Sequence, residues 1–213
     1  MGMPGATAYG GITGILQPKE SETIFISAAS GAVGGLVGQI AKHVYGCDVI
    51  GSCGGKEKCD LITRDYGFDY AIDYKRFSSK DEYVNELVKA APEGIDMYWE
   101  NVGGAQFEAA MEVLRPRGRV ALCGWISDYN SRICKGTVIH PAAMLFKQQK
   151  MEGFLCFPWL RGEKGNFLLD MAQWLREGKI QVHETVFHGL ETWPLAFQTL
   201  FTGAKVGKVV VRV

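Results

Sequence analysis

Short apolar segments alternate with segments of helical periodicity along most of the chain. Residues 23–27 form an apolar, β-branched run that suits a strand buried on both faces, and residues 32–45 then carry small and apolar side chains at helical spacing. The same alternation continues to about residue 177. It predicts strands at 23–27, 48–52, 70–73, 95–100, 118–123 and 150–157, and helices at 32–45, 56–66, 80–91, 105–114 and 166–177.

This order of elements predicts an α/β fold of the doubly wound class. Strands joined through helices by short turns make right-handed crossovers, which place them in one parallel sheet with helices on both faces. The end of the chain breaks the alternation, because strand-like residues 185–188 and 207–213 surround a helix near 192–200. A terminal strand that is so apolar needs a partner. We therefore predict a first domain over residues 1–184 and a segment, 185–213, that belongs with a second domain.

The composition indicates a globular protein without a polyanionic partner. Of its 213 residues, 47% are hydrophobic, and 23 basic side chains balance 23 acidic ones. Nucleic-acid binders usually carry a basic excess, so nucleic acid is not an expected partner. No apolar run reaches the roughly 20 residues that cross a bilayer, and residues 1–11 lack the pattern of a signal peptide. We expect a cytoplasmic protein without membrane contact.

The six cysteines indicate reduced thiols rather than a metal site. Their spacings do not match those of zinc ligands, and His43 alone among the histidines lies within four residues of one of them. No metal is therefore expected. The cysteines are Cys47, Cys53, Cys59, Cys123, Cys134 and Cys156.

A glycine-rich turn follows the first predicted strand directly. Residues 28–35 match the dinucleotide fingerprint G-x-G-x-x-G with Ala29 in the first place, followed by Gly31 and Gly34. Gly31 would let the backbone approach a pyrophosphate, and Gly34 would let the helix lie close to the strand, with free N–H groups at the helix N-terminus for the phosphates. Glycines also mark ordinary strand-to-helix turns, but the position between a buried strand and a helix favours a dinucleotide.

The end of the second predicted strand favours NADP over NAD. An NAD-binding strand usually ends in Asp or Glu, which binds the ribose 2′-hydroxyl. Here no acid stands at the tip, and Lys56 and Lys58 follow it. Their ammonium groups would bind a 2′-phosphate through charge-assisted hydrogen bonds. The alternative is the solvated first turn of a helix, in which Glu57 offsets part of the charge. The missing acid also argues against a methyltransferase.

Several longer strings point to one family over essentially the whole chain. They are residues 3–9, 27–34, 100–104, 123–130, 151–154 and 177–180. On these strings the sequence resembles the zinc-independent medium-chain dehydrogenases/reductases, in the quinone-oxidoreductase-like branch of the prostaglandin reductases and alkenal double-bond reductases. The resemblance implies a Rossmann fold that binds NADP(H). It also implies that the chain lacks most of an N-terminal, GroES-like catalytic domain, to which residues 185–213 would return.

The resemblance implies a cofactor site built from strand ends and from the tail of the chain. The glycine turn would surround the pyrophosphate, Lys58 and Tyr74 would contact the 2′-phosphate, and Asn101 would hold the cofactor where the sheet order reverses. Without the family match, Tyr74 and Asn101 could equally be a half-buried tyrosine and a turn residue. The cofactor-binding residues would be Gly31, Ala32, Val33, Gly34, Lys58, Tyr74, Asn101, Cys123, Gly124, Ser127, Tyr129, Phe154, Leu155, Cys156 and Lys205.

The same resemblance implies a nicotinamide pocket. Residues 154–156 would line it, and Thr7 and Tyr9 would border it at the substrate mouth. Tyr129 is the candidate catalytic residue, with the nicotinamide ribose hydroxyl or a water as alternatives for stabilising an enolate. The chain departs from the family at two positions: Phe146 stands where relatives carry a tyrosine near the ribose, and Lys205 where they carry an asparagine.

The expected activity is NADPH-dependent reduction of a C=C bond conjugated to a carbonyl, in an enal, an enone or a 15-keto lipid. The alternatives are a quinone reductase of the same superfamily and a non-catalytic NADP-binding fragment. The predicted strand at 150–157 would be the outer strand of the sheet. An apolar, unpaired strand edge is a template for pairing, so we expect a homodimer joined through this edge.

Overall fold

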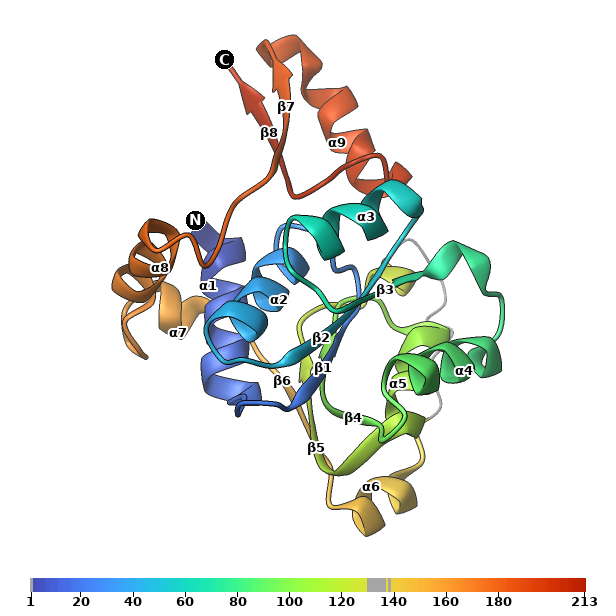
Figure 1. The fold of residues 1–213 in the computed structure, drawn as a ribbon. Coiled ribbons are helices and arrows are strands. Elements are labelled where there is room, and N and C mark those ends of the chain that lie inside the picture. Colours follow the sequence, from blue (N-terminus) through green and yellow to red (C-terminus); the bar gives the residue numbers. More distant parts are fainter. Residues whose placement is uncertain (1, 130–136, 138) are drawn as a thin grey trace.

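A parallel sheet of six strands forms the centre of the computed structural model, which describes residues 2–129, 137 and 139–213 (Figure 1). The strands lie in the order β3-β2-β1-β4-β5-β6, and every neighbouring pair is parallel. The order reverses between β1 and β4, so a crevice is expected at the carboxyl ends of these two strands. The strands are β1 (Thr23–Ile26), β2 (Asp48–Cys53), β3 (Tyr70–Asp73), β4 (Ile95–Glu100), β5 (Leu114–Leu122) and β6 (Lys150–Gly153).

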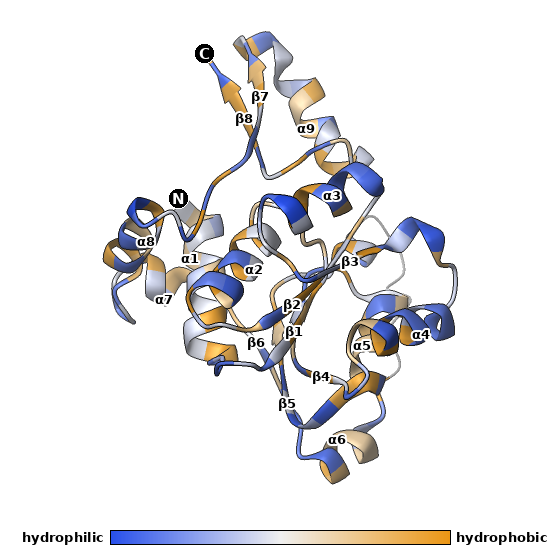
Figure 2. Cartoon of the chain, in the orientation of Figure 1, coloured by the Kyte–Doolittle hydropathy of each residue, from blue (hydrophilic) through white to orange (hydrophobic). Residues whose placement is uncertain are grey.

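Helices cover both faces of the sheet and confirm the doubly wound class. One core contains α2 and α3 against side chains such as Ile24 and Trp99, and the opposite core contains α4 and α5 against Phe25 and Tyr98. Hydrophobic colours concentrate on the strands, whereas the outer sides of α3 and α4 are hydrophilic (Figure 2). The helices on these faces are α2 (Gly34–His43), α3 (Lys56–Arg64), α4 (Lys80–Ala90), α5 (Gly104–Val113), α8 (Phe167–Arg176) and a short 3-10 turn, Tyr74–Arg76.

Local sequence explains where these helices begin and end. The hydroxyl of Ser79 accepts the N–H of Glu82, and the Glu82 carboxylate accepts the N–H of Ser79, so a capping box starts α4. Pro92 follows the end of α4 and cannot continue it. Gly178 has a φ of +70° just after α8, a left-handed conformation that glycine adopts without strain.

The N-terminal helix was not predicted from the pattern. Residues Gly2–Gly10 form α1, and Gly11–Leu16 continue it as a π-helix. Its glycines allow aromatic rings to lie directly on it, because a Cβ on Gly10 or Gly14 would stand 2.5 Å from the indole of Trp159. The helix therefore owes its stability to tertiary packing rather than to the intrinsic propensity of a glycine-rich segment.

The two outer strands differ from the prediction. Strand β5 begins at Leu114, where a helix was expected to end, and runs through Pro116 with a register shift opposite β4. Strand β6 stops at Gly153, so the prediction of a strand to residue 157 is wrong in its last four residues. The short helix α7 (Phe157–Leu160) begins there instead, and Pro158 lies in its first turn, where proline is well tolerated. Helix α6 (Pro141–Lys147), before β6, was also missed.

The C-terminal residues form a small separate unit beside the sheet. Strands β7 (Glu184–His188) and β8 (Lys208–Arg212) pair in parallel, with a 3-10 turn (Leu190–Thr192) and α9 (Trp193–Thr202) between them. The unit projects from the top of the molecule in Figure 1. The apolar terminal strand thus finds its partner within the chain, whereas the boundary at residue 184 stays a prediction. None of the helices in the described ranges has the length and hydrophobicity needed to span a membrane.

Candidate dinucleotide site

The turn after β1 brings the backbone of the chain close to the start of α2. Ala28 has a φ of +52°, and its carbonyl accepts the N–H of Gly31 at 3.0 Å. A Cβ on Gly34 would stand only 2.5 Å from the same carbonyl oxygen, so only glycine fits there. No side chain among the described residues caps the first turn of α2. This turn can therefore present backbone N–H groups to a phosphate.

Lysines from two distant parts of the chain meet beside the end of β2. The ammonium of Lys58 donates to the carbonyl of Gly203 at 2.5 Å, which places α3 against the segment that carries Lys205. Burial lowers the pKa of Lys58, and Lys75 lowers it further. Burial also lowers the pKa of Lys205, with Lys58 and Lys208 adding to the effect. Two ammonium groups in the same neighbourhood can bind an anion through charge-assisted hydrogen bonds.

Three other features complete the end of β2. The Tyr74 side chain lies over Gly54, where an added Cβ would be 2.9 Å from the Tyr74 hydroxyl. Asp73, at the end of the neighbouring strand β3, accepts the N–H of Gly55 at 2.8 Å. Sequence reasoning missed this carboxylate, which sits near the tip although β2 itself carries no acid. The Ser52 hydroxyl is fully buried, so it is out of reach of a ligand.

At the switch point of the sheet, the end of β4 is tied to the end of β1. The side-chain amide of Asn101 donates to the Ser27 carbonyl at 2.6 Å, and its oxygen accepts from the indole N–H of Trp99 at 3.3 Å. The buried Glu100 carboxylate accepts the N–H groups of Val102 and Gly103. Burial raises the pKa of Glu100. Asn101 therefore shapes the crevice, with its side-chain oxygen and one of its two amide N–H groups bonded within the protein. Glu100 is a residue that the sequence did not single out.

The loop after β5 folds across this crevice. The N–H groups of Cys123 and Gly124 both donate to the Glu100 carbonyl, and the N–H of Ser127 donates to the Val102 carbonyl. Tyr129 curls back so that its hydroxyl oxygen accepts the Trp125 N–H at 3.2 Å. Its side chain is 66% exposed, and its hydroxyl proton stays available for a ligand. Asn130, the last residue of the matching string, lies outside the described residues, as does Cys134.

The segment after β6 turns its side chains alternately inward and outward. Phe154 packs edge-on against Trp99, with ring centroids 5.6 Å apart. Cys156 is buried, whereas Leu155 is 70% exposed. Of the three residues expected to line the nicotinamide pocket, Leu155 can offer its side chain freely, and the other two would contribute mainly backbone groups.

The remaining residues that the resemblance singled out are Thr7, Tyr9 and Phe146. Tyr9 is buried and donates to the Asp170 carboxylate at 2.5 Å, and burial together with Asp170 raises the pKa of Tyr9 to about 12. Its hydroxyl therefore braces α1 against α8. Tyr9 also lines a cavity together with Phe154 and Leu155, and its place at the substrate mouth stays a prediction. Thr7 donates to the Met3 carbonyl within α1. Phe146 is 83% exposed in α6, which precedes β6 at the amino ends of the strands, away from the crevice (Figure 1).

Comparison with known proteins finds one matching family model and several similar reductases. The family model described as zinc-binding dehydrogenase matches residues 32–173. Prostaglandin reductase 1 from Bos taurus is 42% identical, and the NADP(+)-dependent 2-alkenal reductase from Nicotiana tabacum is 44% identical, each over 100% of this chain. The crystal structure of CurA from Vibrio vulnificus in complex with NADPH has a TM-score of 0.89 at 43% identity over 100% of this chain. The chain spans 60 to 63% of the length of these relatives.

Proposed function

The chain belongs to the zinc-binding dehydrogenase family of medium-chain dehydrogenases/reductases, in its prostaglandin reductase and alkenal reductase branch, and we propose that it binds NADP(H) for the reduction of a conjugated C=C bond. The observation that carries the cofactor proposal is the meeting of Lys58 and Lys205 beside the end of β2. The names of the relatives support the reaction.

The charges of the crevice fit the phosphates of NADP(H). The pyrophosphate would lie on residues 31–34, where the atoms nearest the Cβ positions of Gly31 and Gly34 are backbone atoms of the turn itself. The 2′-phosphate would lie between Lys58, Lys205 and the Tyr74 hydroxyl. No salt bridge to a carboxylate involves either lysine within the described part of the chain, so both ammonium groups keep hydrogen-bond donors for an anion.

Zinc, which the family's name mentions, does not fit the described residues. These residues contain no group of three or more His, Cys, Asp or Glu side chains placed to hold a metal ion. Burial raises the pKa of Cys47 and of Cys123 to about 12, so both stay thiols, whereas zinc binds thiolates. The proposed reaction therefore has no step that depends on zinc.

In the proposed reaction, the residues of this chain position the reacting groups and donate a hydrogen bond to the substrate. When bound, NADPH would supply a hydride to the C=C bond of an enal, an enone or a 15-keto lipid. Tyr129 would donate its hydroxyl hydrogen bond to the carbonyl oxygen as negative charge develops there. Leu155 would cover the apolar side of the reacting group and exclude water from it.

The test measures binding and turnover separately. NADPH and NADH are titrated into the chain by calorimetry, and NADPH oxidation is then followed with a 2-alkenal and with a naphthoquinone. We expect saturable binding that favours NADPH, and oxidation with the alkenal that falls in Tyr129→Phe by more than any accompanying loss of NADPH affinity explains. Faster oxidation with the quinone would support a quinone reductase instead, and binding without any oxidation would support a non-catalytic NADP-binding protein.

We further propose a homodimer joined through β6. This strand is the edge of the sheet, and Lys150 and Glu152 stand exposed on one face while Met151 points to the other. In an antiparallel pair with a two-fold axis at Met151, Lys150 of one protomer lies opposite Glu152 of the other. The two ion pairs would fix the register of a continuous sheet.

A charge exchange tests this register. Glu152→Lys places lysines opposite each other and should shift the equilibrium toward monomer in sedimentation equilibrium, and the double variant Lys150→Glu, Glu152→Lys should restore the dimer. Glu163→Lys, which changes the same charge beside Arg161 and away from the edge, is the matched control. A wild-type monomer at tens of micromolar (a rough working range) would exclude the dimer.

A further inference from the structure

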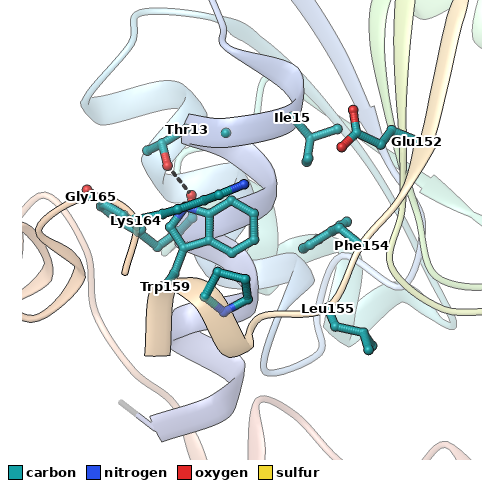
Figure 3. A pocket seen from close by; sticks show the side chains of 11 residues that line it. Thr13, Ile15, Glu152, Phe154, Leu155, Trp159, Lys164 and Gly165 are labelled. Atoms are coloured by element: carbon teal, nitrogen blue, oxygen red, sulfur yellow. Dashed lines mark hydrogen bonds between the residues drawn. The ribbon is translucent and has the colours of Figure 1, made fainter. Parts of the chain in front are cut away.

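A cavity of about 530 Å³ lies beside the edge strand β6, apart from the glycine turn and the lysines. It opens to solvent and is bordered by the N-terminal π-helix, the segment after β6 and helix α7 (Figure 3). Phe154 and Leu155 are shared with the proposed nicotinamide pocket. The volume falls in the range of small-molecule sites, about 300–1,000 Å³.

The cavity has apolar walls on several sides. Ile15, Phe154 and Pro158 line it, and the exposed Leu155 lies next to Phe154 (Figure 3). Phe154 meets the buried Trp159 edge-on, with ring centroids 6.2 Å apart, so this wall is held rigidly by the core. An apolar chain that entered the cavity would remove these surfaces from water.

One cation without a carboxylate partner lines the cavity. The ammonium of Lys164 stands 5.4 Å from the centroid of the Trp159 ring, a cation–π contact. Within the part of the chain that the structure describes, Lys164 forms no salt bridge. Glu152 lies on the opposite side of the cavity (Figure 3). The charge pattern favours one negative group at the Lys164 side and disfavours a second one across the cavity.

We propose that this cavity binds an anionic amphiphile, a monocarboxylate with an unbranched apolar chain. The carboxylate binds the Lys164 ammonium, and the chain lies between Ile15, Phe154 and Pro158. The hydroxyl oxygen of Thr13, whose proton is donated to the Tyr9 carbonyl, faces the cavity as an acceptor and adds no second anion site. The site is separate from the phosphate-binding end of the crevice and needs no bound cofactor.

Calorimetry on the 213-residue chain without cofactor tests the proposal. Decanoate, octanoate, decan-1-ol and decylamine are titrated into the wild type and into Lys164→Gln and Lys164→Arg. The matched control is Arg161→Gln, because Arg161 is an exposed cation of the same segment that stacks on Phe157 and does not line the cavity. Thermal denaturation of each variant checks that the exposed substitutions leave the fold intact.

We expect saturable binding of decanoate that is about three- to tenfold tighter than that of decan-1-ol, the range for a partly exposed charged contact. Octanoate should bind more weakly, by up to about fourfold for each methylene removed from the cavity. Lys164→Gln should abolish the preference for the carboxylate, whereas Lys164→Arg and Arg161→Gln should keep it. Absence of saturable binding, equal affinity for decylamine, or an unchanged preference in Lys164→Gln would overturn the proposal. NADPH affinity is measured separately, so failure here is distinct from failure of the cofactor assignment.

Discussion

Replacing Lys58 by glutamine should weaken NADPH binding by about tenfold and leave NADH binding within about twofold. A hydrogen bond to a charged group contributes about 1.5–3 kcal/mol. The lower end applies because Lys58 is only partly buried and Lys205 remains beside the phosphate. A loss of about 1.5 kcal/mol corresponds to roughly a tenfold change in the dissociation constant.

Reversing the charge extends the series. Lys58→Glu removes the same contact and adds repulsion of about 1 kcal/mol between two negative groups about 4 Å apart in water. NADPH affinity should then fall by roughly 50- to 100-fold, again with little effect on NADH. Lys56→Gln is the matched control. The sequence pattern offered Lys56 for the phosphate as well, but its exposed ammonium, two residues away on the same helix, pairs with Asp60 at 2.5 Å.

The pH dependence of the same binding gives an independent check. Burial lowers the pKa of both Lys58 and Lys205 from the ordinary 10.5. The charged forms bind the phosphate, so the preference for NADPH is lost as the pH rises through these lowered pKa values. The loss should therefore begin below pH 10.5. The assay is calorimetry of both cofactors for each variant, and an equal loss of NADPH and NADH in Lys58→Glu would refute the assignment of the 2′-phosphate to Lys58.

Three further predictions concern the turn and the supporting contacts. Gly31→Asp should abolish dinucleotide binding in titrations. Gly31→Ala adds the same Cβ, 3.2 Å from the Ala28 carbonyl, but no charge, and should retain part of the binding. Equal binding by both variants would show that the pyrophosphate does not lie at Gly31. Tyr9→Phe leaves Asp170 without its donor and should cost about 1–2 kcal/mol in urea denaturation, with NADPH affinity unchanged. Burial opposes ionisation of Glu22, but hydrogen bonds from Arg119 hold the pKa of Glu22 below 4.5. This pair therefore stabilises the fold above pH 4.5, and its contribution is lost as the pH falls through the lowered pKa. Arg119→Leu should flatten that part of the profile of unfolding free energy against pH.

The sheet could be predicted because its sequence pattern and its burial agree. Each inner strand is a short apolar run that is buried on both faces, and each turn carries glycine or a helix cap where the chain reverses. The N-terminal helix escaped prediction because Gly10 and Gly14 are poor helix formers. What stabilises that helix is the Trp159 ring, about 150 residues later in the sequence, and no local pattern reveals such a partner.

The site was predictable in part for a similar reason. The glycine turn and the missing acid after β2 are local signals, and both led to NADP. The approach of Lys205 to Lys58 is a long-range contact, which only the family resemblance suggested. Tyr9 shows the opposite case, since its string matches the family while its hydroxyl is bound to Asp170 in the core. A matching string identifies the fold more safely than it identifies the direction of each side chain.

Lys58 and Lys205 belong to different parts of the molecule. Lys58 lies on α3, which packs on the main sheet, and Lys205 lies in the small unit of β7, α9 and β8. In the proposed assignment, recognition of the extra phosphate would be a joint property of both parts, whereas residues 31–34, which would hold the pyrophosphate, belong to the part around the main sheet. Denaturant that loosens the small unit first would leave a protein that still takes up dinucleotides but no longer distinguishes the phosphorylated form. The preference for NADPH over NADH would then be lost at a lower denaturant concentration than the one that unfolds the parallel sheet.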